Sequence, residues 1–288
     1  MTQSPAITTP AIAPLTSPGT VEEALALLHA GGAGTRAIAG ATWIMRGPTR
    51  GEPVPARLVA LNRIAELQGV EIGAQRARIG AMASHDLMAR SLPDAPDLHA
   101  LARAAGASAN PGIRRLATLG GNLCATGFVA ADLVPALMCL DARIGIATAE
   151  GRRDLDMAEF MALRRGTTPF LVTHATFARS ARRSAHARTP ARDYPVAIAS
   201  LALTLDTGGR IATIRLALGA VEADARRWTA FEARAVGKSP DPAAMAALAR
   251  DLAGGLAPVT ALDAPGWYRA QILPALVGRA FGQIVQEG

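Results

Sequence analysis

Thr118-Leu119-Gly120-Gly121-Asn122 lies at the centre of the stretch that organises this chain, ATLGGNLCATGFVAADLVPALMCLD, residues 117–141. Two adjacent glycines allow positive φ angles and can turn several N–H groups in one direction, the kind of concavity that holds a phosphate. The threonine and the asparagine add short hydrogen-bonding side chains on either side. Asp132 follows, just before an apolar run from residue 133 to 140 that is long enough for a short helix. The stretch therefore predicts one wall of a nucleotide site.

The composition predicts a globular chain of two domains. Its 288 residues are 50% hydrophobic, which is ample for buried cores. The formal charge of +7 would favour a nucleic-acid partner. Lys238 is the only lysine, however, and no basic run is interleaved with aromatic residues for base stacking. We therefore expect no nucleic acid among the partners.

The two cysteines, Cys124 and Cys139, have no CxxC spacing, so we expect no iron–sulfur cluster in this chain. Residues 1–18 are rich in Thr, Ser, Ala and Pro and lack the basic start and apolar core of a signal peptide, which predicts a flexible tail. No stretch is apolar for long enough to span a membrane, and a cytoplasmic location is expected.

The periodicity of apolar residues and the turn signals give a coarse order of elements. Residues 32–37 spell GxGxxA, but a helix precedes these glycines and a short strand follows them, the reverse of a Rossmann unit. The His85-Asp86 pair is not expected to act as an acid–base pair, because neighbours on a helix point in different directions. The helices are expected near residues 21–31, 84–90, 97–105, 133–140, 228–236, 241–252 and 266–281, and the strands near 36–39, 57–62, 69–72, 76–81, 143–149, 152–155, 169–177, 196–205 and 210–218.

Another loop of small residues lies at 39–42. With this loop and the one at 118–122, the chain resembles the FAD-binding medium subunits of the molybdenum hydroxylases, the xanthine dehydrogenase family that includes the carbon monoxide dehydrogenases. The first flavin motif of that family, Ala-Gly-Gly-Thr, is similar to Ala39-Gly40-Ala41-Thr42, and the second, Thr-hydrophobic-Gly-Gly-Asn, is similar to residues 118–122. Further similar segments are 58–67, 79–81, 110–114, 214–219 and 268–281. The resemblance covers nearly everything from Val21 onward, in order.

The resemblance implies an α+β fold: a two-lobed FAD-binding domain of the PCMH type over residues 19–177, a linker over 178–195, and a C-terminal α+β domain over 196–288 with a small antiparallel sheet and helices. Both glycine loops would surround the diphosphate of FAD, and Asp132 would accept a hydrogen bond from an adenosine or ribityl hydroxyl. The flavin contacts that it implies, directly or by adjacency, are Ala37, Ile38, Ala39, Gly40, Ala41, Thr42, Trp43, Ser108, Thr118, Gly120, Gly121, Asn122, Asp132 and His186.

The chain departs from the family pattern in three places. Ala41 replaces the second glycine of the first motif, and residues 126–129 (TGFV) stand where the family has a shorter segment with a Pro. The family's lysine near the flavin falls near His186, and either this histidine or a nearby arginine would supply the cation. The Arg-rich segment around it, residues 179–192, could face an acidic partner or an anionic cofactor, or be a solvated loop.

The resemblance further implies partner chains: a small subunit with two [2Fe-2S] clusters, a large subunit with the molybdopterin cofactor, and a dimer of such heterotrimers. This chain would pass electrons from the clusters through FAD to NAD⁺, oxygen, a quinone or a carrier protein. The alternative is a structural subunit of the same assembly that has lost FAD. A stand-alone flavin oxidase of the vanillyl-alcohol class is a weaker third hypothesis, because the chain has no added substrate domain.

Overall fold

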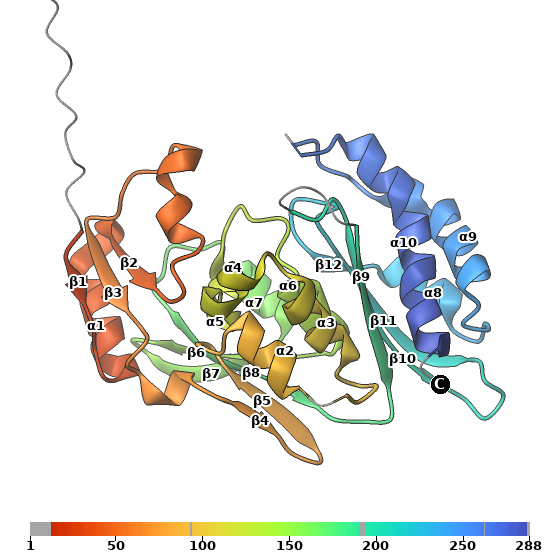
Figure 1. Ribbon diagram of the computed structural model, residues 1–288, viewed down its shortest axis with the longest axis horizontal. Coiled ribbons are helices and arrows are strands. Elements are labelled where there is room, and N and C mark those ends of the chain that lie inside the picture. The colour runs from red at the N-terminus through yellow and green to blue at the C-terminus, as the bar shows by residue number, and fades with distance from the viewer. Residues whose placement is uncertain (1–12, 93, 190–193, 262, 287–288) are drawn as a thin grey trace, which may run out of the picture.

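The computed structural model describes residues 13–92, 94–189, 194–261 and 263–286. The described chain forms three sheets, each with its own helices, and they follow one another along the long axis of the molecule (Figure 1). Two of these units make up the lobes of the N-terminal region, and the third is the C-terminal domain. The predicted α+β class is confirmed.

The first lobe is a three-stranded parallel sheet in the order β1-β3-β2, with helix α1 packed against it (Figure 1). Thr20 caps α1 by accepting a hydrogen bond from the N–H of Glu23, as the sequence predicts. The GxGxxA letters fall on a helix end and a strand, so they form no Rossmann turn. The elements are β1 (Leu15–Thr16), α1 (Val21–Gly31), η1 (Gly32–Gly34), β2 (Thr35–Ile38), η2 (Ile44–Arg46), η3 (Pro48–Arg50), β3 (Arg57–Ala60) and η4 (Ala65–Leu67).

The second lobe is a five-stranded antiparallel sheet in the order β4-β5-β8-β6-β7. Helices gather in the middle of the molecule, between this sheet and the C-terminal domain (Figure 1). Fully buried aliphatic side chains such as Leu101, Leu119 and Leu137 join them to the sheet in one core. The elements are β4 (Val70–Ile72), β5 (Arg76–Gly80), α2 (His85–Ser91), α3 (His99–Ala107), α4 (Pro111–Leu116), α5 (Leu119–Cys124), α6 (Leu133–Cys139), β6 (Arg143–Thr148), β7 (Gly151–Leu155), α7 (Met157–Leu163) and β8 (Leu171–Ala178).

The C-terminal domain is a four-stranded antiparallel sheet in the order β12-β11-β10-β9, covered by helices α8, α9 and α10 (Figure 1). Its core is separate and is built from Phe231, Phe281 and aliphatic residues of the sheet. The buried Arg269 of α10 ties the domain together by donating to the carbonyls of Val196 and Ala220. The elements are β9 (Arg183–Arg188), β10 (Ile198–Leu205), β11 (Ile211–Gly219), β12 (Arg226–Arg227), α8 (Thr229–Ala235), α9 (Pro242–Leu252), η5 (Ala253–Gly255) and α10 (Gly266–Gln286).

The structure corrects the expected linker. Residues 183–188 form strand β9, which pairs antiparallel with β10 from Arg188↔Ile198 to Arg183↔Leu203. The sequence pattern hides this strand because its residues, RSAHAR, lack large aliphatic side chains. Alanines suffice at Ala185 and Ala187 because the long helix α10 covers the strand closely. Arg192 of the Arg-rich segment lies outside the described residues.

The expected tail and the glycine stretch also differ from prediction. Leu15 and Thr16 form β1, a parallel edge strand beside β3, so part of the predicted tail belongs to the first lobe. The rest of that prediction, residues 1–12, lies outside the described residues. Residues 119–124, expected as a loop, form helix α5, and neither Gly120 nor Gly121 has a positive φ.

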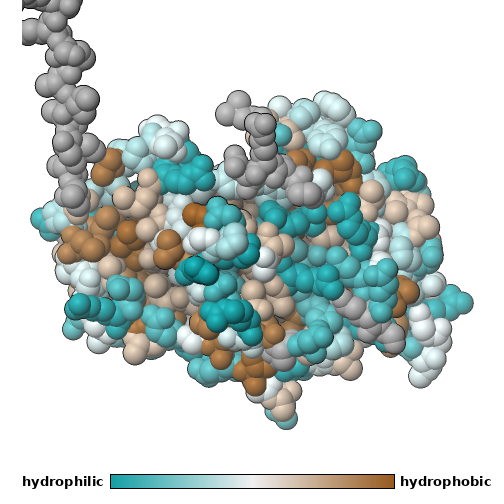
Figure 2. All heavy atoms as spheres, in the orientation of Figure 1, coloured by the Kyte–Doolittle hydropathy of each residue, from teal (hydrophilic) through white to brown (hydrophobic). Residues whose placement is uncertain are grey.

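On the face shown in Figure 2, hydrophilic side chains cover much of the middle, and hydrophobic ones are more frequent on the side of the first lobe. Leu15, Met45 and Val54 are exposed apolar residues of the first lobe, each with more than half of its area exposed. Within the described residues, no helix has the length and apolar character needed to cross a bilayer.

Candidate functional site

The first loop, residues 39–43, leaves the carboxyl end of β2 and presents unused hydrogen-bond donors. The N–H groups of residues 40–43 donate to no other group in the described part of the chain. Carbonyls of the same loop are occupied, since Ala41 and Trp43 accept from Met45 and Arg46. Consecutive free N–H groups attract an anion. This loop therefore has the donors that a diphosphate requires.

Gly40 brings the first loop into contact with the second motif. A Cβ atom placed on Gly40 would lie 1.7 Å from the carbonyl oxygen of Leu116 and 2.5 Å from its carbonyl carbon. No other residue type allows the two backbones to approach so closely. Since Leu116 lies two residues before Thr118, this glycine joins the two predicted motifs into one site.

The second motif has a different role from the one that its sequence suggests. Thr118 caps α5 and accepts from the N–H of Gly121, at 3.1 Å. The N–H groups of Leu119 and Gly120 donate to the carbonyls of Ala83 and Ala81, at 2.9 and 2.8 Å. These N–H groups are therefore already hydrogen-bonded within the protein and are not free to bind a phosphate. The glycines instead permit close packing, because a Cβ on Gly120 would lie 3.1 Å from Ala81.

Asn122 is the polar group of the second motif that keeps an unused hydrogen-bonding atom. Its side chain is only 8% exposed, and its Oδ1 has no hydrogen-bond partner among the described residues. Buried polar atoms are nearly always paired in folded proteins. An unpaired amide oxygen at this place fits a site that a polar ligand completes.

A buried charged cluster lies where the second lobe meets the C-terminal domain. Asp132, 2% exposed, precedes α6, and its Oδ1 lies 3.0 Å from Nε of Arg188 and 3.4 Å from Nε2 of His186. Neither contact has the angles of a hydrogen bond; the contact with Arg188 is an ion pair, and the contact with His186 becomes one when the ring is protonated. Nδ1 of His186 lies 2.8 Å from Oγ of Ser200. Strand β9 thus places His186 and Arg188, the histidine and the arginine expected as alternative cations near the flavin, beside the same carboxylate.

Ser108 lies beside the same cluster. It ends α3 and is 8% exposed, and the neighbouring carbonyl of Ala107 accepts from the Arg188 guanidinium. Ala37 and Ile38 lie within β2, where they pair with Val59 and Ala60. These two residues therefore position the first loop and do not belong to the charged cluster.

Three aromatic side chains from different parts of the chain stack beside the first loop. The ring centroids of Trp43 and Phe128 are 4.6 Å apart, and those of Phe128 and Tyr194 are 5.2 Å apart. Arg46 donates to the hydroxyl of Tyr194, at 2.7 Å, and Arg50 lies over the ring of Trp43. Loops from the first lobe, the second lobe and the C-terminal domain therefore meet at this stack.

Sequence reasoning missed Phe128, Tyr194 and Arg188. Phe128 belongs to the segment 126–129 that departs from the family pattern, so a large aromatic residue in that departure was a usable signal. Arg188 was one of several arginines in a segment expected to be a linker. Only the pairing of β9 with β10 assigns this arginine to the carboxylate.

His85 is buried beside the cluster without a partner for its ring. It is 1% exposed, and neither ring nitrogen makes a hydrogen bond with a described residue. Burial lowers its pKa to about 4, against the opposing effect of the Asp132 charge, with a smaller lowering from Arg114. Asp86, the neighbour of His85 in the chain, pairs instead with Arg90, at 2.9 Å.

His85→Leu is expected to weaken the acid sensitivity of the fold. The unfolded chain binds a proton at this histidine below its ordinary pKa of 6.5, whereas the folded chain does so only near 4. Stability contributed by the neutral ring is therefore lost as the pH falls through this window, by about 2 kcal/mol between pH 7 and pH 5. Urea unfolding at both pH values should show a correspondingly smaller loss in the leucine variant, which also lacks the unpaired polar ring. His29→Gln, on the exposed side of α1, is the control, and an unchanged loss in His85→Leu would contradict the prediction.

Comparison with known proteins matches both parts of the chain to described families. Residues 10–175 match the model of the FAD binding domain in molybdopterin dehydrogenase, and residues 182–284 match that of the CO dehydrogenase flavoprotein C-terminal domain. The 6-hydroxypseudooxynicotine dehydrogenase complex subunit alpha of Paenarthrobacter nicotinovorans is 27% identical over 91% of both chains. The nicotinate dehydrogenase FAD-subunit of Eubacterium barkeri is 30% identical over 50% of this chain and 49% of its own.

Solved structures share the fold. A chain of the reconstituted CO dehydrogenase from Oligotropha carboxidovorans superposes with a TM-score of 0.85 at 24% identity, over 98% of this chain and 100% of that one. A chain of quinoline 2-oxidoreductase from Pseudomonas putida 86 gives 0.82 at 24% identity, over 97% and 99%. Because the first family model alone matches more than half of the chain, this protein belongs to the family of FAD-binding medium subunits of the molybdenum hydroxylases.

Proposed function

We propose that this chain is the electron-transferring flavoprotein subunit of a heterotrimeric molybdenum hydroxylase. It takes electrons from a partner [2Fe-2S] subunit and passes them through FAD to NAD⁺, oxygen, a quinone or a carrier protein. The observation that carries the proposal is the first loop, whose free N–H groups are held beside the second motif by Gly40. FAD, when bound, supplies the capacity to accept electrons singly or in pairs.

The residues present fit FAD. The N–H groups of residues 40–43 would hold the diphosphate, because they are consecutive donors without partners. Asn122 would receive a hydrogen bond on its unpaired Oδ1. The amide dipoles, and not a lysine or arginine, carry the phosphate contact in this proposal, since no cationic side chain belongs to the loop itself.

The charged cluster would control the electrostatics of the flavin. Two cationic or basic groups, Arg188 and His186, share the single carboxylate of Asp132. A cation next to a flavin favours its negatively charged reduced form. While the flavin is oxidised and adds no negative charge, the carboxylate of Asp132 would balance the positive charge of the cation. The positive charge of the cluster would therefore be countered in both the oxidised and the reduced state.

The remaining parts of the proposal concern assembly. A small iron–sulfur subunit and a large molybdenum-cofactor subunit would complete the enzyme, in a dimer of heterotrimers. The name of the P. nicotinovorans relative, a subunit of a dehydrogenase complex, supports the existence of partner chains. For the boundaries we propose a FAD domain over residues 19–177 and a C-terminal domain that begins with β9, since this strand belongs to the C-terminal sheet.

The test is to produce the chain together with the gene products of its neighbouring open reading frames and to measure flavin. We expect flavin absorbance in the purified complex, bleaching when the substrate of the molybdenum subunit is added. A fully assembled complex that stays colourless after incubation with excess FAD would overturn the proposal. That outcome would establish the second candidate, a structural subunit without FAD.

Two observations favour this second candidate enough to keep it. Ala41 has a φ of 63°, a left-handed conformation that a side chain disfavours. The aromatic stack of Trp43, Phe128 and Tyr194 closes one end of the first loop. Both features would weaken flavin binding unless contacts between FAD and the loop compensate for the backbone strain at Ala41.

Ala41→Gly is expected to tighten flavin binding by a few fold. The left-handed conformation costs alanine about 1–2 kcal/mol, a cost that opposes flavin binding because the flavin-free loop can relax away from this conformation; glycine adopts it without that strain but loses about 0.5–1 kcal/mol of backbone entropy when the loop is ordered. Fluorescence titration of the deflavinated protein with FAD measures the change. Ala220→Gly is the matched control, because Ala220 also has a positive φ, 57°, but lies in the C-terminal domain. Tighter binding in both variants, or in neither, would contradict the assignment of the strain to the flavin loop.

A further inference from the structure

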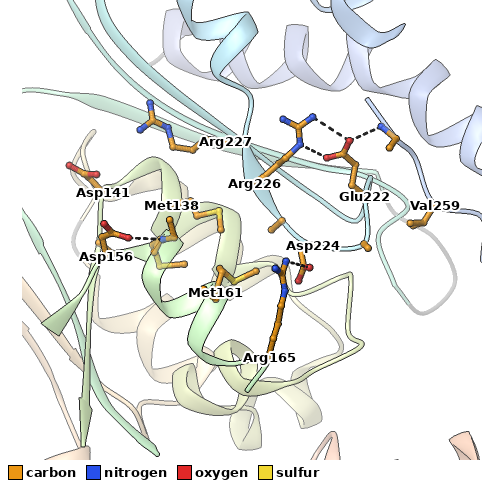
Figure 3. Close-up of a pocket in the computed structure, with 17 residues that line it drawn as sticks. Met138, Asp141, Asp156, Met161, Arg165, Glu222, Asp224, Arg226, Arg227 and Val259 are labelled. Atoms are coloured by element: carbon orange, nitrogen blue, oxygen red, sulfur yellow. Dashed lines mark hydrogen bonds and ion pairs between the residues drawn. The ribbon is translucent and has the colours of Figure 1, made fainter. Parts of the chain in front are cut away.

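A cavity of about 700 Å³ lies between the FAD domain and the C-terminal domain (Figure 3). One wall comes from the end of α6 and from α7, and the other from the segment that leads into β12 and from residues 257–259. The cavity's position at a domain boundary and its volume are both typical of a small-molecule site.

This cavity is separate from the flavin site. Asp132 precedes the first residue of α6, whereas Met138 and Asp141 line the cavity at the other end of that helix. Six residues of helix separate Asp132 from Met138, a rise of about 9 Å. None of the residues that we assign to the flavin contributes to the lining.

The apolar part of the lining consists of small and adaptable side chains. Met138, Met157 and Met161 are buried and line the cavity from α6 and α7, and Figure 3 shows Met138 and Met161 projecting toward it. Thioether sulfurs make favourable contacts with aromatic rings, and the unbranched side chain adjusts to the shape of an occupant. The other apolar lining residues are Ala142, Ala158, Ala162, Ala223, Ala225, Ala257 and Val259. A wall of this kind favours a flat aromatic molecule.

The charged residues of the lining all have partners in this chain. Arg165 pairs with Asp224 and Arg226 with Glu222, both within the lining itself (Figure 3). The other three have partners elsewhere. Asp141 pairs with Arg215, Arg227 pairs with Glu232, and Asp156 accepts hydrogen bonds from two N–H groups at the start of α7. A charged occupant would therefore find no unpaired opposite charge among the lining residues. The occupant should therefore be uncharged.

We propose that this cavity binds an uncharged aromatic compound of about two fused rings, held by the three methionines. The cavity would thus give the subunit a second small-molecule site, independent of FAD. Binding there bridges the two domains, because each domain supplies one wall.

The test is calorimetric titration of the purified full-length chain with 2-naphthol, an uncharged two-ring probe. We expect saturable binding of one equivalent, and at least tenfold weaker binding of naphthalene-2-sulfonate, which adds a charge to the same rings. Ala158→Trp fills the cavity from an exposed position on α7 and should weaken 2-naphthol binding at least tenfold. Ala243→Trp, at an exposed position on α9, is the matched control and should bind as the parent does.

Three results would overturn the proposal: no saturable binding of 2-naphthol, equal affinity for the sulfonate, or unchanged affinity in Ala158→Trp. If that variant does not fold, Ala162→Trp tests the same wall. Flavin content is measured in every sample and should not differ between the variants. A loss of probe binding at constant flavin content therefore reports on this cavity, whereas absence of flavin from the parent protein reports on the proposed function.

Discussion

Gly40→Ala is expected to deprive the subunit of most of its flavin. The new methyl group would lie 1.7 Å from the carbonyl oxygen of Leu116, a backbone atom that cannot move aside alone. Either the first loop or the end of α4 must shift, at a cost of roughly 1–3 kcal/mol for an overpacked contact. Such a shift separates the N–H groups of residues 40–43 from Thr118 and Asn122. We expect FAD affinity to fall on the order of 10- to 100-fold, since about 1.4 kcal/mol corresponds to tenfold.

Titration of the deflavinated variant with FAD, followed by fluorescence, measures this effect. Gly282→Ala is the control, because a Cβ on Gly282 in α10 has no neighbour within 4 Å. That change should leave flavin affinity at the parental value. Parental affinity in Gly40→Ala would show that close approach of the two loops is not needed for binding.

Asp132→Asn is expected to destabilise the folded chain strongly. The substitution keeps the shape of the side chain but removes the charge that faces Arg188 and His186 inside the protein. Leaving a buried cation without its partner costs about 3–5 kcal/mol, and the partly buried Arg188, 20% exposed, should show the lower part of this range. For a chain of this size we expect a decrease in Tm of roughly 10 °C. Differential scanning calorimetry of the deflavinated protein measures this effect independently of flavin.

A second variant separates charge from shape. Asp132→Asn combined with Arg188→Met removes the unpaired cation and should recover part of the lost Tm. Asp86→Asn is the surface control, since the exposed pair of Asp86 with Arg90 is worth at most a few tenths of a kcal/mol. A decrease for Asp132→Asn no larger than that for Asp86→Asn would refute the buried ion pair.

Local pattern was sufficient for most elements of the fold. Thr20 and Ser84 cap α1 and α2 by accepting from the N–H groups of Glu23 and Leu87, and such N-cap chemistry depends on a few neighbouring residues. The hairpin of β10 and β11 and the amphipathic helices α9 and α10 follow from periodicity in the same way. The strand β9 was missed because its apolar residues are only alanines, and their burial depends on α10, far along the chain.

The candidate site shows the same difference between features that local sequence predicts and features that depend on distant residues. The two glycine motifs could be found as letters, and Ala41 could be recognised as a departure. The different roles of the two motifs could not be predicted, because whether an N–H group is free depends on carbonyl groups elsewhere in the chain. The second motif donates to Ala81 and Ala83, which no local pattern reveals, and the first loop is left with the free donors.

By itself, the sequence determined the family, the α+β order of elements and the two motifs, since these depend on residue types at short spacing. Only the tertiary structure decided which glycine performs which task. Gly40 allows two backbones to touch, Gly120 allows a helix to pack, and the carboxylate of Asp132 meets Arg188. These contacts join residues 39 to 76 positions apart, so they arise from the packing of lobes and domains and leave no mark in local sequence.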